Sequence, residues 1–170
     1  MRPDNSQSPP PAPRANAALD LEPFHAALAP GARLIGIDVG TKTLGLALSD
    51  VLRTVASPLE TIRRRKFSLD AARLLELAAE HGIGGFVIGL PANLDGSEGS
   101  RAQSTRAFAR NLANLTPLPL LFWDERLSTA AAERTLIEAD TSRKRRGELI
   151  DKLAATIILQ TALDRMRTLT

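Results

Sequence analysis

The chain has no cysteine, no tyrosine and few histidines. Among its 170 residues there are no cysteines and two histidines, which excludes disulfides and thiolate metal sites and argues against a histidine-rich zinc site. A metal would have to be held by carboxylates, which favours a hard cation such as Mg²⁺ or Mn²⁺. One tryptophan and five phenylalanines offer little surface for stacking on bases. If the chain binds nucleic acid, contact with the phosphate backbone is the better expectation.

Long apolar runs are also missing. No stretch approaches the roughly 18 residues that a membrane span needs, which predicts a protein without a membrane partner. Residues 1–14 carry five prolines among polar residues and lack the apolar core of a secretory signal. We expect residues 1–30 to be a mostly disordered extension rich in proline and alanine. We expect a single domain over residues 31–170. We also expect the protein to be located in the cytoplasm.

The rest of the composition is typical of a globular domain. Hydrophobic residues make up 44% of the chain and charged residues 24%. The net charge is +3 and the sequence pI about 9.9, which is a mild bias toward polyanionic partners.

The hydrophobic pattern predicts three strands, followed by alternating helices and strands. Ser68 is the expected N-cap of the first long helix, and Gly82 is expected to end it. This β-β-β-α-β-α-β-α order indicates an α/β fold, a ribonuclease H-like mixed sheet flanked by helices. The expected strands are 33–39, 44–49, 54–61, 85–90 and 118–123, and the expected helices are 20–29, 67–81, 100–115, 128–139 and 147–167.

One carboxylate, Asp38, lies within the apolar run of the first strand. Burying such a charge costs several kcal/mol unless a cation, metal or substrate compensates it. Gly40 and Gly45 remove side chains nearby, so that a bulky ligand could approach the backbone. The alternative is a tight β-hairpin in which Asp38 and the turn threonines satisfy backbone amides.

Three further acids follow later elements. Asp124 and Glu125 come directly after the strand 118–123, and Asp151 lies near the start of the last helix. Parallel strands deliver the residues that follow them to one sheet edge, where we expect these acids to meet Asp38. Such acids repel each other unless divalent cations neutralise them, and two Mg²⁺ ions about 4 Å apart could support phosphodiester hydrolysis. Alternatively, they are ordinary surface charges.

Basic residues lie close to these acids. Four successive cations form a predicted loop just before Asp151, and phosphate contacts there would add affinity and salt dependence. The alternative is a solvated connector. The loop 91–99 follows a buried strand and is expected to form a wall of the same cleft, or else to be an exposed loop with Ser100 as a helix cap. The four cations are Arg143, Lys144, Arg145 and Arg146.

Four blocks in chain order resemble the YqgF (RuvX) family. They are IDVGTK at 37–42, VIGLP with DGS at 87–97, WDERLST at 123–129 and IDKLAA with ILQ at 150–160. The resemblance covers roughly residues 33–164. It implies a ribonuclease H-like fold related to Holliday junction resolvases. It also implies a nuclease role in maturing the 5′ end of pre-16S ribosomal RNA in the bacterial cytoplasm.

The resemblance also implies site residues. Asp38, Glu125 and Asp151 would be the catalytic acids and the ligands of Mg²⁺ or Mn²⁺, with Asp124 as a neighbour. The resolvase relatives place an acid at the end of the strand that corresponds to residues 86–90. This chain has Gly89 there, so Glu125 must supply the ligand from the next strand. The residues expected to bind nucleic acid are Lys42, Arg126, Arg143, Lys144, Arg145 and Arg146.

Several alternatives stay open at this stage. The favoured partner is an RNA precursor, with branched DNA and ribosomal particles as further candidates, and the oligomeric state is not predicted. A Holliday junction resolvase-type DNA endonuclease would use the same acids. A non-catalytic RNA-binding ribosome-assembly factor would need only the basic residues. A phosphotransferase of the actin and sugar-kinase superfamily shares the Asp-x-Gly-Thr loop but needs two domains around ATP.

Overall fold

A five-stranded mixed sheet forms the centre of the computed structural model, which describes residues 18–93, 95–127 and 143–169, with the backbone alone over 143–151. The strand order is β3-β2-β1-β4-β5. The first three strands pair antiparallel, and β4 and β5 continue the sheet in parallel on the other side of β1. The predicted mixed sheet is therefore confirmed. The strands are β1 (Arg33–Val39), β2 (Thr43–Ser49), β3 (Ala56–Arg63), β4 (Ile83–Leu90) and β5 (Leu120–Asp124).

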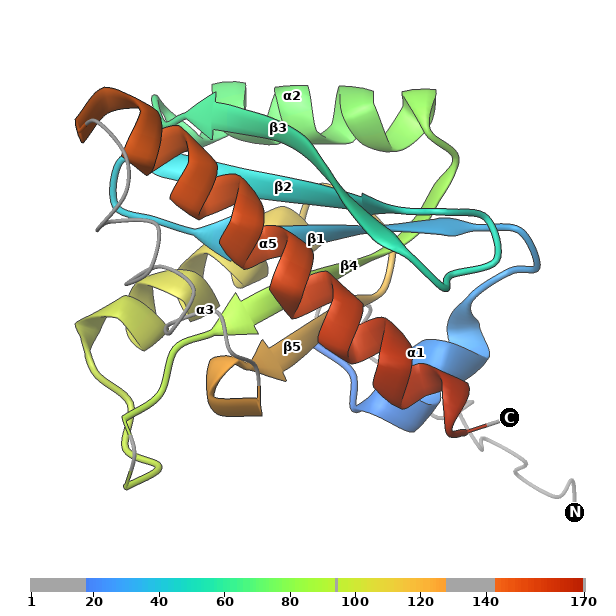
Figure 1. The fold of residues 1–170 in the computed structure, drawn as a ribbon. Coiled ribbons are helices and arrows are strands. Elements are labelled where there is room, and N and C mark those ends of the chain that lie inside the picture. The colour runs from blue at the N-terminus through green and yellow to red at the C-terminus, as the bar shows by residue number, and fades with distance from the viewer. Residues whose placement is uncertain (1–17, 94, 128–142, 170) are drawn as a thin grey trace, which may run out of the picture.

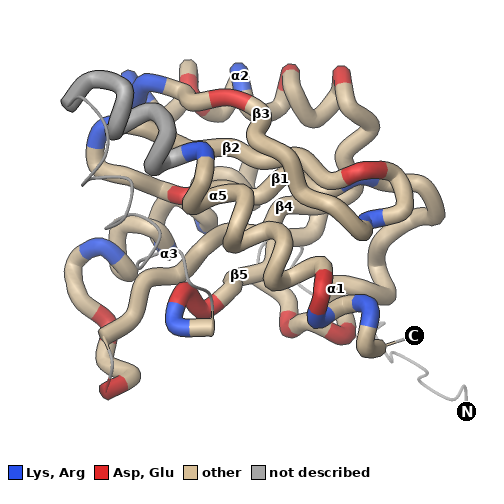
Figure 2. Tube along the Cα trace, in the orientation of Figure 1, with Lys and Arg blue, Asp and Glu red and all other residues tan. Residues whose placement is uncertain are grey.

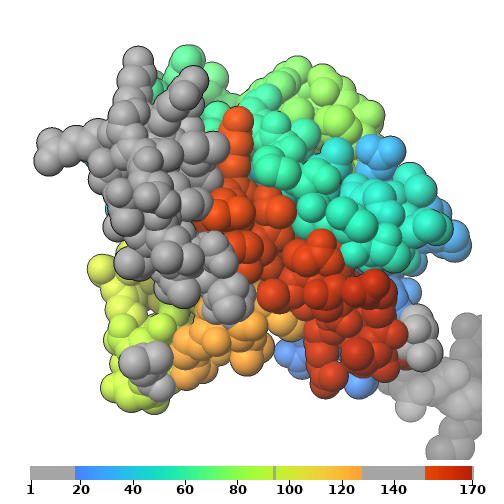
Figure 3. Space-filling model, viewed as in Figure 1, coloured from blue at the N-terminus to red at the C-terminus, as the bar shows by residue number. Residues whose placement is uncertain are grey.

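Helices cover both faces of this sheet. Helices α2 (Phe67–Glu80) and α3 (Ser100–Ala113) pack on one face, and the long helix α5 (Arg143–Arg167) crosses the other (Figure 1). In the space-filling view, α5 lies across the strands between β3 and β5 (Figure 3). Successive residues of β1 alternate between these layers, as the strand period of two requires. Ile35 and Ile37 belong to the core under α2 and α3, whereas Leu34 belongs to the core under α5.

Close packing of α5 depends on a glycine in β1. A Cβ atom at Gly36 would lie 2.7 Å from the Leu159 Cβ and 3.0 Å from the Ala155 carbonyl oxygen. The missing side chain lets the helix backbone approach the middle of the sheet. Gly36 therefore faces α5, and so does Asp38 two residues later in the same strand.

The start of the packed domain differs from the predicted boundary at residue 31. Helix α1 (Leu21–Ala27) forms within the predicted range, and Phe24 is fully buried against Gly85. Just before it, Leu19 forms a parallel bridge with Leu121, and its N–H donates to the Leu120 carbonyl at 2.8 Å. Residues 18–30 thus belong to the domain, because an aromatic side chain and a backbone pairing attach them to the sheet. Residues 1–17 lie outside the described part of the chain.

Two predicted helix starts also need correction. Helix α2 is capped by Lys66 and not by Ser68, because the Lys66 carbonyl accepts the N–H groups of Leu69 and Asp70. Gly82 follows this helix with φ 63°, as expected. The four cations from Arg143 onward are helical, so the predicted basic loop is wrong in its conformation. Arginine, lysine, leucine and alanine all favour a helix, and no proline interrupts residues 143–167.

Two remaining predictions concern the segment before α5 and the membrane. The expected helix 128–139 lies outside the described residues. None of the helices described is long and apolar enough to cross a membrane.

Candidate functional site

Asp38 lies near the end of the central strand β1. Its side chain is on the face that α5 covers, and the residue is only 1% exposed. Its neighbours in both adjacent strands are glycines. Gly45 of β2 is its direct partner, and Gly89 of β4 follows Ile88, which pairs with Ile37. The neighbouring strands therefore add no side chains beside this carboxylate.

Glu125 brings a second carboxylate to the same place. It follows β5 directly and begins the 3-10 helix η1 (Glu125–Leu127). Its Oε1 atom lies 3.0 Å from the position that a Cβ atom at Gly89 would occupy. The Glu125 side chain thus bends back over β4, above the residue next to Asp38. Two acids, one from β1 and one from η1, approach one point of the sheet, although they are 87 positions apart in the sequence (125 − 38).

The third predicted acid, Asp151, lies in the first part of α5. Its side chain is outside the described residues, so the meeting of all three acids stays a prediction. Helix α5 packs against β1, β2, β3 and β4, and therefore crosses the strand that carries Asp38 (Figure 1). Within the described residues, no three histidines or acids gather as metal ligands.

Asp124 occupies a different environment from Glu125. Trp123 belongs to the core under α5, and strand alternation turns Asp124 to the opposite face of the sheet. There its carboxylate accepts hydrogen bonds from the Arg126 guanidinium at 2.6–3.1 Å and from the Arg126 N–H at 2.9 Å. These hydrogen bonds hold the pKa of Asp124 below its usual range. Asp124 is therefore engaged by Arg126 and faces away from Asp38.

The loop after β4 is folded on itself. Asp95 accepts hydrogen bonds from the Ser97 hydroxyl at 2.6 Å and the Ser97 N–H at 2.9 Å, which lower its pKa. A Cβ atom at Gly96 would lie 3.6 Å from an Arg126 guanidinium nitrogen. The loop therefore lies beside Arg126, next to the end of β5, and its role as a wall of the site at Asp38 stays a prediction. Helix α3 after it is capped by Gly99, and Ser100 is its first residue.

The predicted nucleic-acid-binding residues lie on three elements. Lys42 is exposed in the turn between β1 and β2, and Arg126 lies in η1 beside Asp124. The four cations 143–146 open α5, and their side chains are outside the described residues.

Sequence reasoning overlooked the role of Arg64. Its side chain donates to the Gly40 carbonyl at 2.6 Å, and its N–H donates to the Lys42 carbonyl at 2.8 Å. Arg64 thus joins the end of β3 to the turn that follows Asp38. The signal was visible as the run of four cations at 63–66.

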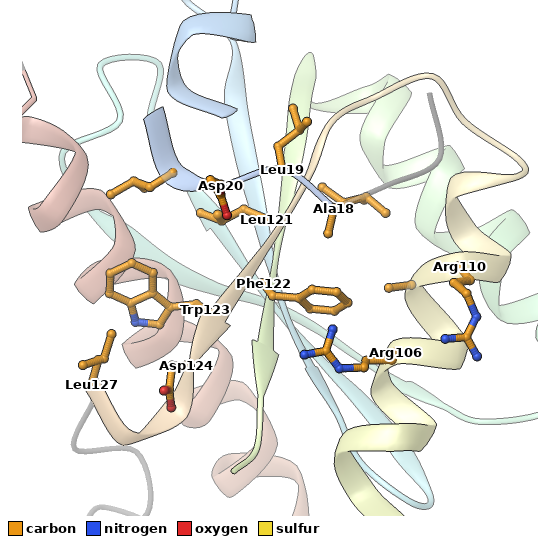
Figure 4. A pocket seen from close by; sticks show the side chains of 13 residues that line it. Ala18, Leu19, Asp20, Arg106, Arg110, Leu121, Phe122, Trp123, Asp124 and Leu127 are labelled. Atoms are coloured by element: carbon orange, nitrogen blue, oxygen red, sulfur yellow. The ribbon is translucent and has the colours of Figure 1, made fainter. Parts of the chain in front are cut away.

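A pocket of about 680 Å³ lies along the edge of β5 and not at Asp38. Phe122 and Trp123 project to opposite sides of this strand, and Arg106 lies over the Phe122 ring at 5.1 Å (Figure 4). Of the predicted acids whose side chains the structure describes, Asp124 alone lines the pocket. The pocket is therefore separate from the two carboxylates over Gly89.

Comparison with models of known protein families shows to which family this chain belongs. Residues 32–165 match the model of the RuvX family, which is described as a Holliday junction resolvase. The chain belongs to the RuvX family. The predicted resemblance is thereby confirmed, over nearly the range that the sequence blocks indicated.

Individual RuvX relatives are highly similar to this chain. A protein of Rhodobacter capsulatus is 65% identical over 146 residues, covering 86% of this chain and 92% of the relative. A protein of Ruegeria pomeroyi is 62% identical over 149 residues, covering 88% and 97%. Both carry the name "Putative pre-16S rRNA nuclease".

A solved structure shows the shared fold. RuvC of T. thermophilus in complex with a Holliday junction substrate aligns with a TM-score of 0.51 at 16% identity. The alignment covers 81% of this chain and 97% of that chain. The predicted ribonuclease H-like fold is confirmed.

Proposed function

We propose that this RuvX-family protein is a metal-dependent nuclease that hydrolyses phosphodiester bonds and acts in maturing the 5′ end of pre-16S rRNA. One observation carries the proposal. The buried carboxylate of Asp38 in β1 and the carboxylate of Glu125 in η1 approach each other on either side of Gly89. The names of the relatives supply the substrate. Bacterial rRNA precursors are made in the cytoplasm, which is where we place the activity.

The two carboxylates fit a divalent cation. Burying a charged carboxylate costs several kcal/mol, and a second carboxylate nearby adds repulsion. A bound cation would offset both costs, and carboxylate oxygens are the ligands that Mg²⁺ and Mn²⁺ prefer. Asp38 and Glu125 would hold it, with Asp151 completing the set from α5. When bound, the cation activates water and stabilises the charge that develops on the phosphodiester.

Other residues would position the substrate. Arg126 is held by its hydrogen bonds to Asp124, so its guanidinium enters binding already oriented. Lys42 lies exposed in the turn after Asp38. Together with the cations 143–146 of α5, these groups would contact phosphates on both sides of the acids.

Different observations bear on the three alternative functions. Membership of the RuvX family, together with one sheet in the part of the chain that the structure describes, leaves no support for the two-domain phosphotransferase. The description of the family and the RuvC-like fold favour branched DNA as the second candidate substrate. An assembly factor without catalysis would bind RNA and leave it intact.

The experiment is a cleavage assay on a substrate panel. Labelled RNA spanning the 5′ end of 16S rRNA, an unrelated single strand and a four-way DNA junction are each incubated with Mg²⁺, Mn²⁺ or a chelator. We expect divalent-dependent cleavage of the precursor RNA. Cleavage of the junction alone would identify a resolvase, and tight RNA binding without any cleavage would identify the assembly factor.

A further inference from the structure

A second group of cations lies at the end of β3. It consists of Arg63, Arg65 and Lys66, here called the β3-end cluster, and all three residues are exposed. Figure 2 shows this basic stretch where β3 runs into α2. None of the three forms an ion pair with an acid in the described part of the chain. Their charges are therefore directed to solvent and not used in folding.

The cluster lies at the same sheet edge as Asp38. Asp38 pairs with Gly45, which pairs with Thr61, and two residues further on Arg63 pairs with Thr43. Neighbouring strands are about 4.8 Å apart, so β3 lies about 10 Å from β1. In the strand order, β3 is on the side of β1 opposite β5, and Glu125 and Arg126 lie in η1, which directly follows β5. The cluster therefore flanks the acids on the side that Arg126 does not reach.

The backbone of the cluster is held firmly. Arg64 bonds the turn after Asp38 through its side chain and its N–H. The Arg65 N–H donates to both carboxylate oxygens of Asp70, at 3.1 and 3.2 Å, and Asp70 is only 4% exposed. The exposed cations thus project from a segment whose position relative to Asp38 is fixed.

A shallow pocket accompanies the cluster. It has a volume of about 270 Å³ between β3 and α2, and Arg63 and Arg65 line it. Its two acids are already engaged, because Glu60 pairs with Arg73 at 2.7 Å and Asp70 bonds the backbone of residue 65. The pocket is large enough for a phosphate group and presents two guanidinium groups without acid partners among the described residues.

We propose that the β3-end cluster binds the phosphate backbone of one flank of the nucleic-acid substrate. The inference rests on the proposed nuclease function and extends it to the path of the substrate. The cluster lies two strands, about 10 Å, from the strand that carries Asp38, so it would contact backbone phosphates a few nucleotides from the scissile phosphate. The substrate would then run past the end of β1 and the start of β2, from η1 to the end of β3.

The test compares two triple variants with equal loss of charge. The first is R63A/R65A/K66A. The matched control is R110A/R165A/R167A. These control positions lie toward the end of the sheet opposite the β3-end cluster. Arg110 is near the end of α3, which precedes β5. Arg165 and Arg167 follow Gln160, whose side chain hydrogen-bonds residues at the start of β3. Thermal melting should show both variants folded. Binding to labelled precursor RNA is measured by anisotropy with a chelator present, at several salt concentrations.

We expect R63A/R65A/K66A to bind at least about tenfold more weakly and to lose up to about one unit of salt slope per phosphate contact. Shortening one flank of the RNA to about three nucleotides should weaken its binding to the wild type and to the control variant, but not its binding to R63A/R65A/K66A. Equal affinity and slope for wild type and R63A/R65A/K66A would overturn the inference while leaving the nuclease proposal intact. A wild type that binds no nucleic acid would overturn both.

Discussion

At the scale of single residues, the molecule is defined by which side chains are present and absent around Asp38. The position of Asp38 in an apolar strand, followed by a glycine-containing turn, was predictable because it depends on local sequence alone. The need for a glycine at position 89 was not predictable, because the side chains that fill the space beside it, Glu125 and Ile158, come from distant segments of the chain. Tertiary contacts of this kind leave no periodic signal in the sequence.

Replacing Asp38 with asparagine should abolish cleavage and leave the fold intact. Without a metal, the change removes one of two neighbouring carboxylates, so the melting temperature should stay the same or rise. Cleavage assays and thermal melting of the purified D38N protein check this. Unchanged cleavage would mean that Asp38 is not part of the site.

Gly89 gives a second test at this scale. A Cβ atom there would meet the Ile158 Cδ1 and the Glu125 carboxylate, so G89A alone should cost about 1–3 kcal/mol of folding free energy. In an I158V background the methyl contact is gone while the conflict with Glu125 remains. We expect G89A/I158V to cleave at least about tenfold more slowly than I158V, in assays at equal folded fraction. Equal rates would show that the Glu125 position over Gly89 does not matter.

At the scale of helices, strands and loops, periodicity predicted most elements to within a few residues. Strand alternation and helical stripes are local properties of the sequence, and the observed strands and helices agree with them. The wrong predictions concern segments whose structure depends on charge or on tertiary contacts. The charge of the segment from Arg143 onward predicts a loop, whereas its helix propensity continues α5 through it. The domain begins before residue 31 because Phe24 is buried against β4, which no local pattern shows.

The turn between β2 and β3 makes a prediction about pH. Asp50 accepts hydrogen bonds from the Val55 N–H at 3.0 Å and from the Thr54 N–H and hydroxyl at 2.7 and 2.8 Å. These bonds lower its pKa below the usual 3.8. A lowered folded-state pKa adds stability that is present above about pH 4 and is lost as the pH falls through the folded value.

D50A should therefore be less stable than wild type at pH 7, by about 1 kcal/mol for the lost turn bonds. The difference should shrink as the pH falls below about 4. Urea unfolding of both proteins between pH 7 and pH 2 measures it. A difference that stays constant over this range would show that ionisation of Asp50 does not support the turn.

At the scale of the whole molecule, the strand order brings distant segments together. The sequence order of elements favoured a mixed sheet, but the pairing of β1 between β2 and β4 places Asp38 at its centre. Acids then approach from β1 and from the end of β5, α5 crosses the same edge, and cations lie on both flanks. The central claim is that Asp38 and Glu125, and not Asp124, form the catalytic centre.

The most direct test of that claim is a single-turnover cleavage assay on precursor RNA with Mn²⁺ titrated into wild type, D38N, E125Q and D124N. We expect D38N and E125Q to lose at least about a hundredfold in rate at every Mn²⁺ concentration, because each removes a charge that would hold the cation. D124N should stay within about tenfold of wild type, since Asp124 faces away and holds Arg126. Loss of cleavage in D124N with full activity in E125Q would contradict the account.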